Sequence, residues 1–245
     1  MSIHLKNLKP GDLGEATIVV GDPGRVLLIS EKWENKKEVS NSREFLLING
    51  YYKGHLVSVC STGIGVGSTE IAVTELIENG AKQIVRCGGC GAWDQTINPG
   101  DIILNSGMQR SSGMFSSYVP ETYPAVADPL LLSKINQSLV KNNQKVHVGL
   151  GLTTETYYLG QGRAPKINSE LPIPNIVEDY NKFNIINCEM ESAVLFLLGS
   201  IYNIPVANCL VVHVSRSTEK WVEDKDYNKI HQNTSEFVLD ALLNL

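Results

Sequence analysis

Short runs rich in β-branched residues alternate with helical patterns along almost the whole chain. The apolar runs predict strands at Ala16–Val20, His55–Cys60, Gln83–Val85, Asp101–Leu104, Lys145–Leu152, Ile185–Cys188 and Val206–Val214. The periodic segments predict helices at Thr69–Glu78, Pro129–Lys141, Ser192–Tyr202 and Lys229–Leu243. This alternation is typical of an α/β fold, in which ligands bind beyond the carboxyl ends of the strands. We therefore expect the functional residues directly after the predicted strands.

The length of the chain fits one large α/β domain. The 245 residues include no stretch rich enough in Pro, Gly or Ser to form a linker, and no segment repeats at a fixed period. We therefore predict a single domain covering residues 1–245.

Charge and hydropathy exclude two classes of partner. The net charge of -5 argues against the broad basic surface that binding to a nucleic acid backbone requires. The longest uninterrupted apolar run, Ala193–Leu198, is far shorter than the ~20 residues of a membrane helix. The first residues have no apolar signal core. We expect no nucleic acid or membrane partner and a cytoplasmic location.

Two glycine-containing segments after predicted strands can hold an anion. Gly21–Arg25 places a guanidinium beside exposed backbone amides, although a solvated turn that starts a helix explains it as well. Arg86 precedes a predicted loop, Cys87–Gly91, whose glycines suit a phosphate cradle. Its two cysteines also match the spacing of a redox or zinc motif, but no second Cys or His pair has a suitable spacing. The odd total of five cysteines favours reduced, buried thiols.

Together these segments resemble the hexameric nucleoside phosphorylase family, and within it the bacterial-type uridine phosphorylases. The resemblance covers nearly the whole chain, in the family's order: His4, GDPGRV (21–26), NSREF (41–45), CSTGIG (60–65), the Arg86–Gly91 segment, AVAD (125–128), TTETYYLGQGR (153–163) and CEMES (188–192). It implies a single domain with a central mixed β-sheet flanked by helices. It also implies phosphorolysis of uridine, with deoxyuridine and thymidine left open as substrates. In this reaction phosphate attacks the anomeric carbon of the nucleoside, releasing the pyrimidine base and a pentose 1-phosphate.

For the phosphate, the resemblance implies contacts from the Gly21 amide, Arg25 and Arg86, with Arg43 reaching in from a neighbouring subunit. Arginine suits this role because its planar fork pairs with two oxygens and stays charged. The chain departs from the family at Gly89, where a hydroxyl residue normally contacts the phosphate. We expect the missing hydrogen bond to weaken phosphate binding, and a threonine at this position to restore it provided that Gly89 has a negative φ and can accept a β-branched side chain.

For the ribose, the resemblance implies a binding group in the CEMES segment. Glu191 accepts hydrogen bonds from the 2′ and 3′ hydroxyls, Met190 packs on the sugar and Glu189 belongs to the same group. His4 of the adjacent subunit contacts the 5′ hydroxyl. Acidic residues also favour a first helical turn because of the helix dipole, so a purely structural role for both glutamates stays open.

For the base, Gln161 and Arg163 are the distinguishing residues. The glutamine amide offers a donor and an acceptor in one plane, matching O2 and N3–H of uracil, and Arg163 can donate to O4 as charge grows on the ring. The resemblance places Tyr157 against the base. Purine-specific relatives carry an acidic residue where this chain has Arg216, which cannot act as a general acid at neutral pH. We expect Arg86, Glu191, Gln161 and Arg163 to be the catalytic residues.

The remaining expectations concern ions and assembly. Glu44, Ile64 and Ser68 fall where the family can hold a monovalent cation, such as potassium, between paired subunits. No organic cofactor is expected, and inorganic phosphate is the co-substrate. Because the resemblance assigns His4 and Arg43 to a neighbour's site, it implies a homo-oligomer, a hexamer built as a trimer of dimers.

Three other functions stay open from the sequence. A purine nucleoside phosphorylase is disfavoured by Arg216 and by the Gln161 and Arg163 pair. A nucleosidase, which uses water in place of phosphate, is favoured by Gly89 but disfavoured by the phosphate-side arginines. A non-catalytic nucleoside-binding protein would keep the fold and the ligand contacts without turnover.

Overall fold

A mixed sheet of ten strands organises the chain. We describe a computed structural model that covers residues 2–111, 113–168 and 170–245. The strands are β1 (Ala16–Val20), β2 (Glu34–Ser42), β3 (Phe45–Tyr52), β4 (His55–Ser61), β5 (Ile84–Ala92), β6 (Ile102–Ser111), β7 (Val146–Thr154), β8 (Ile185–Glu189), β9 (Val206–Ser215) and β10 (Lys220–Trp221). Their order is β10-β9-β6-β7-β8-β5-β1-β4-β3-β2, and β9 also pairs with β5. Strands β5, β9, β6, β7 and β8 therefore form a closed ring, from which β1, β4, β3 and β2 continue as an open sheet.

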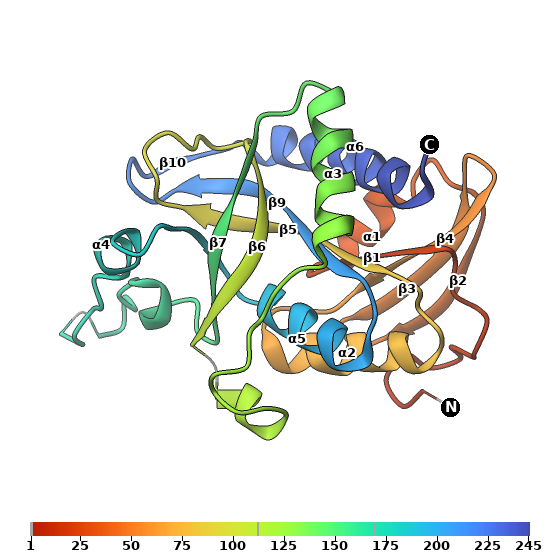
Figure 1. The fold of residues 1–245 in the computed structure, drawn as a ribbon, viewed down its shortest axis with the longest axis horizontal. Coiled ribbons are helices and arrows are strands. Elements are labelled where there is room, and N and C mark those ends of the chain that lie inside the picture. The colour runs from red at the N-terminus through yellow and green to blue at the C-terminus, as the bar shows by residue number, and fades with distance from the viewer. Residues whose placement is uncertain (1, 112, 169) are drawn as a thin grey trace.

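Helices cover this sheet on both sides (Figure 1). They are α1 (Pro23–Ile29), α2 (Val66–Glu78), α3 (Pro129–Lys141), α4 (Ile176–Asn181), α5 (Ser192–Tyr202) and α6 (Asp224–Leu243), with short 3₁₀ turns η1 (Gly113–Ser117) and η2 (Leu159–Gln161). Helix α6 packs on α1 and α3, whereas α2 packs on α5 across the sheet. The expected α/β class, with one domain and a mixed sheet between helices, is confirmed.

Local sequence signals explain where the helices begin. The Asp22 side chain accepts a hydrogen bond from the Gly24 amide at 2.8 Å, and Asp128 accepts one from Leu131 in the same way. Pro23 and Pro129 each follow their capping aspartate, where the fixed φ of proline suits a first helical turn. The GDPGR segment thus starts a helix, as one of its two sequence interpretations expected, and this helix sets the position of Arg25.

Helix α5 is the most deeply buried helix of the described chain. All residues from Ser192 to Gly199 are buried, in agreement with their uninterrupted apolar character. Gly199 lies so close to β9 that a Cβ would stand 2.4 Å from a methyl carbon of Val206. Dense packing therefore fixes the start of α5, which follows directly on the CEMES segment.

Within the described residues, no helix is long and apolar enough to cross a membrane.

Candidate active site

One cavity of about 260 Å³ collects residues that lie far apart along the chain. Some lie where the sequence predicted a site, after the carboxyl ends of strands, and the others lie within strands β5, β8, β9 and β10 or in helix α6. The lining residues are Gly21, Arg25, Ile64, Arg86, Gly89, Cys90, Gly91, Tyr157, Gln161, Arg163, Cys188, Glu189, Met190, Glu191, His213, Val214, Trp221 and Tyr227. The cavity thus brings together eleven of the sixteen residues that the sequence proposed for the site, and the five that lie outside it are His4, Arg43, Glu44, Ser68 and Arg216.

The predicted loop at Cys87–Gly91 is wrong, because these residues form the second half of strand β5. Strand β5 pairs with β9 along its whole length, whereas its register with β1 ends at Arg86 and that with β8 begins at Gly91. The stretch between these two pairings borders the cavity. The glycines therefore belong to the sheet, and they leave room for side chains that approach the strand.

Arg86 is held in place by two carboxylates at the end of β8. Its Nε donates to Glu189 at 3.2 Å and its Nη2 donates to Glu191. A Cβ at Gly88 would lie 2.7 Å from the Arg86 guanidinium carbon, so the glycine lets the side chain fold across the strand. Burial disfavours the Arg86 charge, but Glu191 and Glu189 outweigh this effect and raise the pKa of Arg86. The guanidinium is therefore charged and fixed.

Glu189 and Glu191 have different surroundings. One oxygen of Glu189 accepts the Glu191 and Ser192 amides at 2.8 and 2.7 Å, so it caps the first turn of α5, and the other accepts the Thr153 hydroxyl at 2.5 Å. This supports the structural role that the sequence left open for Glu189. Glu191 instead accepts the Gly65 amide at 2.6 Å. Burial raises the pKa of the Glu191 carboxyl, and the Arg86 charge opposes that shift.

Arg25 and Arg86 together form an anion-binding end of the cavity. The Nη1 atoms of both side chains are buried and have no hydrogen-bond partner among the described residues. Buried donors without partners are costly, and an anion bound between them would satisfy both. Gly21 lies beside them, since its Cβ position is 3.5 Å from an Arg25 nitrogen. These contacts agree with the predicted phosphate group.

The opposite end of the cavity is built from residues 157–163, which follow β7. Gln161 is buried and donates from Nε2 to the Thr154 hydroxyl at 3.1 Å, while its Oε1 accepts the Cys188 thiol at 3.6 Å. The Arg163 guanidinium stacks on the Tyr157 ring at 4.7 Å. A planar amide, a stacked cation and an aromatic face therefore converge at this end.

Arg216 directly follows strand β9, and its side chain lies beside Gly91. Its side chain is 6% exposed, and its Nε and Nη1 have no hydrogen-bond partner within the described chain. A Cβ at Gly91 would lie 3.3 Å from the Arg216 side chain, so this glycine again makes room for an arginine. Arg216 does not itself line the cavity.

Position 89 does not meet the condition that a β-branched side chain must fit there, so the gain expected from a threonine does not follow. Gly89 has no positive φ, but its Cβ would stand 1.9 Å from the hydroxyl oxygen of Tyr227. No real pair of atoms tolerates this separation, so the space of a side chain at position 89 is already filled.

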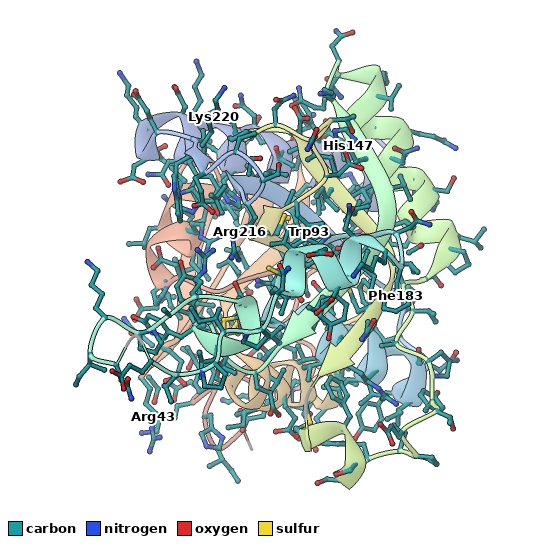
Figure 2. The ribbon with its side chains drawn as sticks, turned by 90° about the vertical axis from the view of Figure 1, so that its left-hand side faces the viewer. Arg43, Trp93, His147, Phe183, Arg216 and Lys220 are labelled. Carbon is teal, nitrogen blue, oxygen red and sulfur yellow. The ribbon has the colours of Figure 1, made fainter. Side chains whose placement is uncertain are left out.

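The two residues expected to act in a neighbouring subunit lie outside the cavity of this chain. His4 is held by Glu75, with a distance of 3.0 Å between its Nδ1 and the carboxylate. Arg43 has a φ of 57° at the turn between β2 and β3 and lies at the edge of the molecule, far from Arg216 (Figure 2). Arg43 is exposed, and the His4 side chain is 31% exposed.

A surface hollow next to the cavity is lined by Glu44, Ile64 and Ser68. Gly21 and Arg25 line both the hollow and the cavity. The Ser68 hydroxyl donates to the Ile64 carbonyl at 3.3 Å. Carboxylate, carbonyl and hydroxyl oxygens are the donor types that hard cations prefer, so the residues fit the expected monovalent cation in kind. Within the described residues there is no group of three or more His, Cys, Asp or Glu side chains suited to a metal ion.

The redox and zinc interpretation of Cys87 and Cys90 finds no support. All five cysteines are free and buried. Burial raises the pKa of the Cys87 thiol to about 12 and that of Cys90 well above its usual range. Thiols that stay protonated are poor nucleophiles and poor metal ligands.

Sequence reasoning missed several residues of the cavity, namely Cys90, Cys188, His213, Val214, Trp221 and Tyr227. His213 has no ligand spacing in the sequence, which predicts a core or surface residue, but its ring stacks on that of Tyr227 at 4.2 Å and lines the cavity. Tyr227 falls in the first turns of α6, which begins at Asp224 and not at the predicted Lys229. Asp224 and Asp226 at that start are the signal that could have moved the boundary, since acidic residues favour a first helical turn.

The sequence matches a known protein family. The Phosphorylase superfamily model matches residues 15–243. This chain belongs to the phosphorylase superfamily. Among its relatives, the uridine phosphorylase of Thermococcus kodakarensis is 37% identical over 90% of this chain and 80% of the relative. The guanosine phosphorylase of Halorubrum lacusprofundi is 32% identical over 78% of this chain and 75% of the relative.

A solved structure of this superfamily also matches the fold. The uridine phosphorylase of Vibrio fischeri superimposes with a TM-score of 0.85 at 28% identity, covering 100% of this chain and 98% of that chain. The family expected from the sequence is therefore confirmed.

Proposed function

We propose that this superfamily member is a uridine phosphorylase, which cleaves uridine with phosphate to uracil and ribose 1-phosphate. The observation that carries this proposal is the pairing of two ends in one cavity, with Arg25 and Arg86 at one end and Gln161 and Arg163 at the other. The uridine phosphorylase relatives support the same substrate.

The residues suggest how the reaction proceeds. Phosphate held by Arg25 and Arg86 lies next to Glu191, the expected ligand of the ribose hydroxyls. A phosphate oxygen forms a bond to the anomeric carbon while the bond to the base nitrogen breaks, and the bonding pair leaves with the base. Gln161 and Arg163 stabilise that negative charge through N–H donors that are already in place. Arg216 adds positive charge behind them.

Guanosine phosphorolysis is the second candidate, because the Halorubrum relative bears that name. A purine leaves more easily when its ring is protonated, and Arg216 cannot supply that proton at neutral pH. Uridine is therefore favoured.

A substrate panel tests the proposal. Uridine, thymidine, inosine and guanosine are each incubated with and without phosphate, and base release is followed by absorbance. We expect phosphate-dependent cleavage of uridine and at least ~100-fold lower kcat/KM for inosine and guanosine, because unpaired polar groups in a site reject the wrong ligand. Equal purine cleavage would overturn the pyrimidine assignment, and release of free ribose without phosphate would indicate a nucleosidase.

Assembly, cation and location complete the proposal. The outward positions of His4 and Arg43 support a homo-oligomer, which we propose to be a hexamer. In it these residues would complete the site of a neighbour, and the hollow at Glu44, Ile64 and Ser68 would hold potassium. We propose a cytoplasmic enzyme with phosphate as co-substrate. Sedimentation of the active species tests the assembly, since a fully active monomer would remove His4 and Arg43 from the site.

A further inference from the structure

Tyr227 lines the cavity from helix α6, to which the sequence analysis assigned no site residue. It lies in α6, yet its hydroxyl oxygen is 1.9 Å from the position that a Cβ of Gly89 would occupy. The phenol thus fills the space that a side chain of strand β5 would otherwise fill. Arg25, Arg86 and Tyr227 line the same cavity.

Two histidines hold the Tyr227 ring in place. His213 stacks on it at 4.2 Å with an interplanar angle of 16°, and His231 meets it edge-on at 4.4 Å. Burial lowers the pKa of both histidines, so neither carries a charge near pH 7. A ring clamped on two sides loses little freedom when its hydroxyl binds a ligand, so the donor is preorganised.

The surroundings of the hydroxyl favour an anion as its partner. The Arg25 and Arg86 charges act on this phenol, and both guanidinium groups present a buried Nη1 that has no partner in the described chain. Burial raises the pKa of Tyr227 to about 12, so the hydroxyl remains a donor at neutral pH. Two cationic donors and one neutral donor therefore border one small volume.

We propose that the Tyr227 hydroxyl donates a hydrogen bond to the bound phosphate and replaces, from helix α6, the hydroxyl that strand β5 lacks at Gly89. The inference rests on the proposed phosphorolysis. It explains why the chain combines a glycine at position 89 with a tyrosine at position 227, since either side chain excludes a larger residue at the other position.

The first test compares Tyr227→Phe with the wild type in steady-state kinetics. Loss of one hydrogen bond to a charged ligand raises the phosphate KM about tenfold, whereas the uridine KM changes less than about twofold. Tyr52→Phe is the matched control, because its hydroxyl bonds Asp240 of the same helix at 3.0 Å but lies outside the cavity. An unchanged phosphate KM in Tyr227→Phe, or a larger change in the uridine KM, would overturn the proposal.

The second test moves the hydroxyl back to the strand. When Tyr227 is present, the Cβ of Gly89→Thr overlaps the Tyr227 hydroxyl. When Tyr227 is replaced by Phe, the nearest atom to that Cβ is the ring carbon Cζ at 3.2 Å, which requires a shift of only a few tenths of an ångström. We expect Gly89→Thr alone to raise the phosphate KM, and the double variant to bind phosphate better than Tyr227→Phe. A lower phosphate KM for Gly89→Thr alone would contradict the proposal.

A binding measurement separates this inference from the proposed function. Inorganic phosphate should raise the Tm of the wild-type protein, and at equal concentration it should raise that of Tyr227→Phe less, because stabilisation follows the ratio of ligand concentration to Kd. This readout needs no turnover. Base release independent of phosphate would defeat the proposed phosphorolysis, whereas equal phosphate-induced shifts in both proteins would defeat the role of Tyr227.

Discussion

The two ends of the cavity are built in different ways. At the phosphate and ribose end, Arg86 lies within strand β5 and Glu189 ends strand β8, and ion pairs with low exposure hold them together. At the base end, Tyr157 and Arg163 flank a single 3₁₀ turn in a connection that projects from the sheet, and Tyr157 is 44% exposed (Figure 1). The residues proposed to bind phosphate and ribose are thus held by the sheet, and those proposed to bind the base lie on a connection.

This difference predicts that substitutions at the two ends have different effects. Substitutions at the strand-built end should affect both the phosphate KM and the stability of the fold, because the side chains there also hold strands together. Substitutions in the connection should change only the kcat/KM values for different nucleosides. Four variants test this separation.

Arg86→Ala should have the largest effect, lowering kcat/KM at least ~100-fold, because the phosphate loses a charged fork and two buried carboxylates lose their partner. The Tm should fall as well. Arg110→Ala is the control, since that arginine lies in β6 outside the cavity. Unchanged saturation by phosphate in Arg86→Ala would show that the anion binds elsewhere.

Gln161→Leu should lower the kcat/KM for uridine about 10- to 100-fold while the phosphate KM stays near its wild-type value, because only contacts to the base are lost. Steady-state kinetics with each substrate varied measure this split. Gln137→Leu on the exposed face of α3 controls for the loss of an amide. A parallel rise of the phosphate KM would mean that the two ends are coupled.

The sequence predicted the strand-built end more completely than its surroundings. Residues that lie close in sequence and follow a strand, such as Glu189 and Glu191, were found because the strand end fixes where they lie. The course of β5 was missed, since glycines after Arg86 favour a loop unless neighbouring side chains need the space above them. Tyr227 was also missed. Its contact with Gly89 joins positions that are far apart in the sequence, so no local sequence pattern indicates it.

Gly199→Ala tests how far the strand-built end depends on the packing of α5. The new methyl group would overlap Val206, so the free energy of unfolding should fall by about 1–3 kcal/mol. Gly67→Ala is the matched control, because no atom lies within 4 Å of its Cβ position in helix α2, and it should be neutral or slightly stabilising. Urea unfolding measures both. A loss confined to Gly67→Ala would contradict the close packing of α5 on β9.

Glu75→Gln should have the smallest effect, and it tests whether the rigid construction extends to His4 at the N-terminal segment. Glu75 is 7% exposed and accepts the amides of Ile3, His4 and Leu5 at 2.7–3.2 Å. Burial alone would raise the pKa of Glu75, but these amides and the His4 ring outweigh it and lower the pKa. A carboxyl whose pKa is lower in the folded state stabilises the fold above its unfolded pKa, and that contribution disappears as the pH falls through the folded value. The variant should therefore lose about 1–2 kcal/mol at pH 7 and progressively less below the unfolded pKa of ~4.3. Urea unfolding of both proteins across this pH range measures the difference, and a difference that does not shrink in acid would show that the Glu75 charge does not hold the segment.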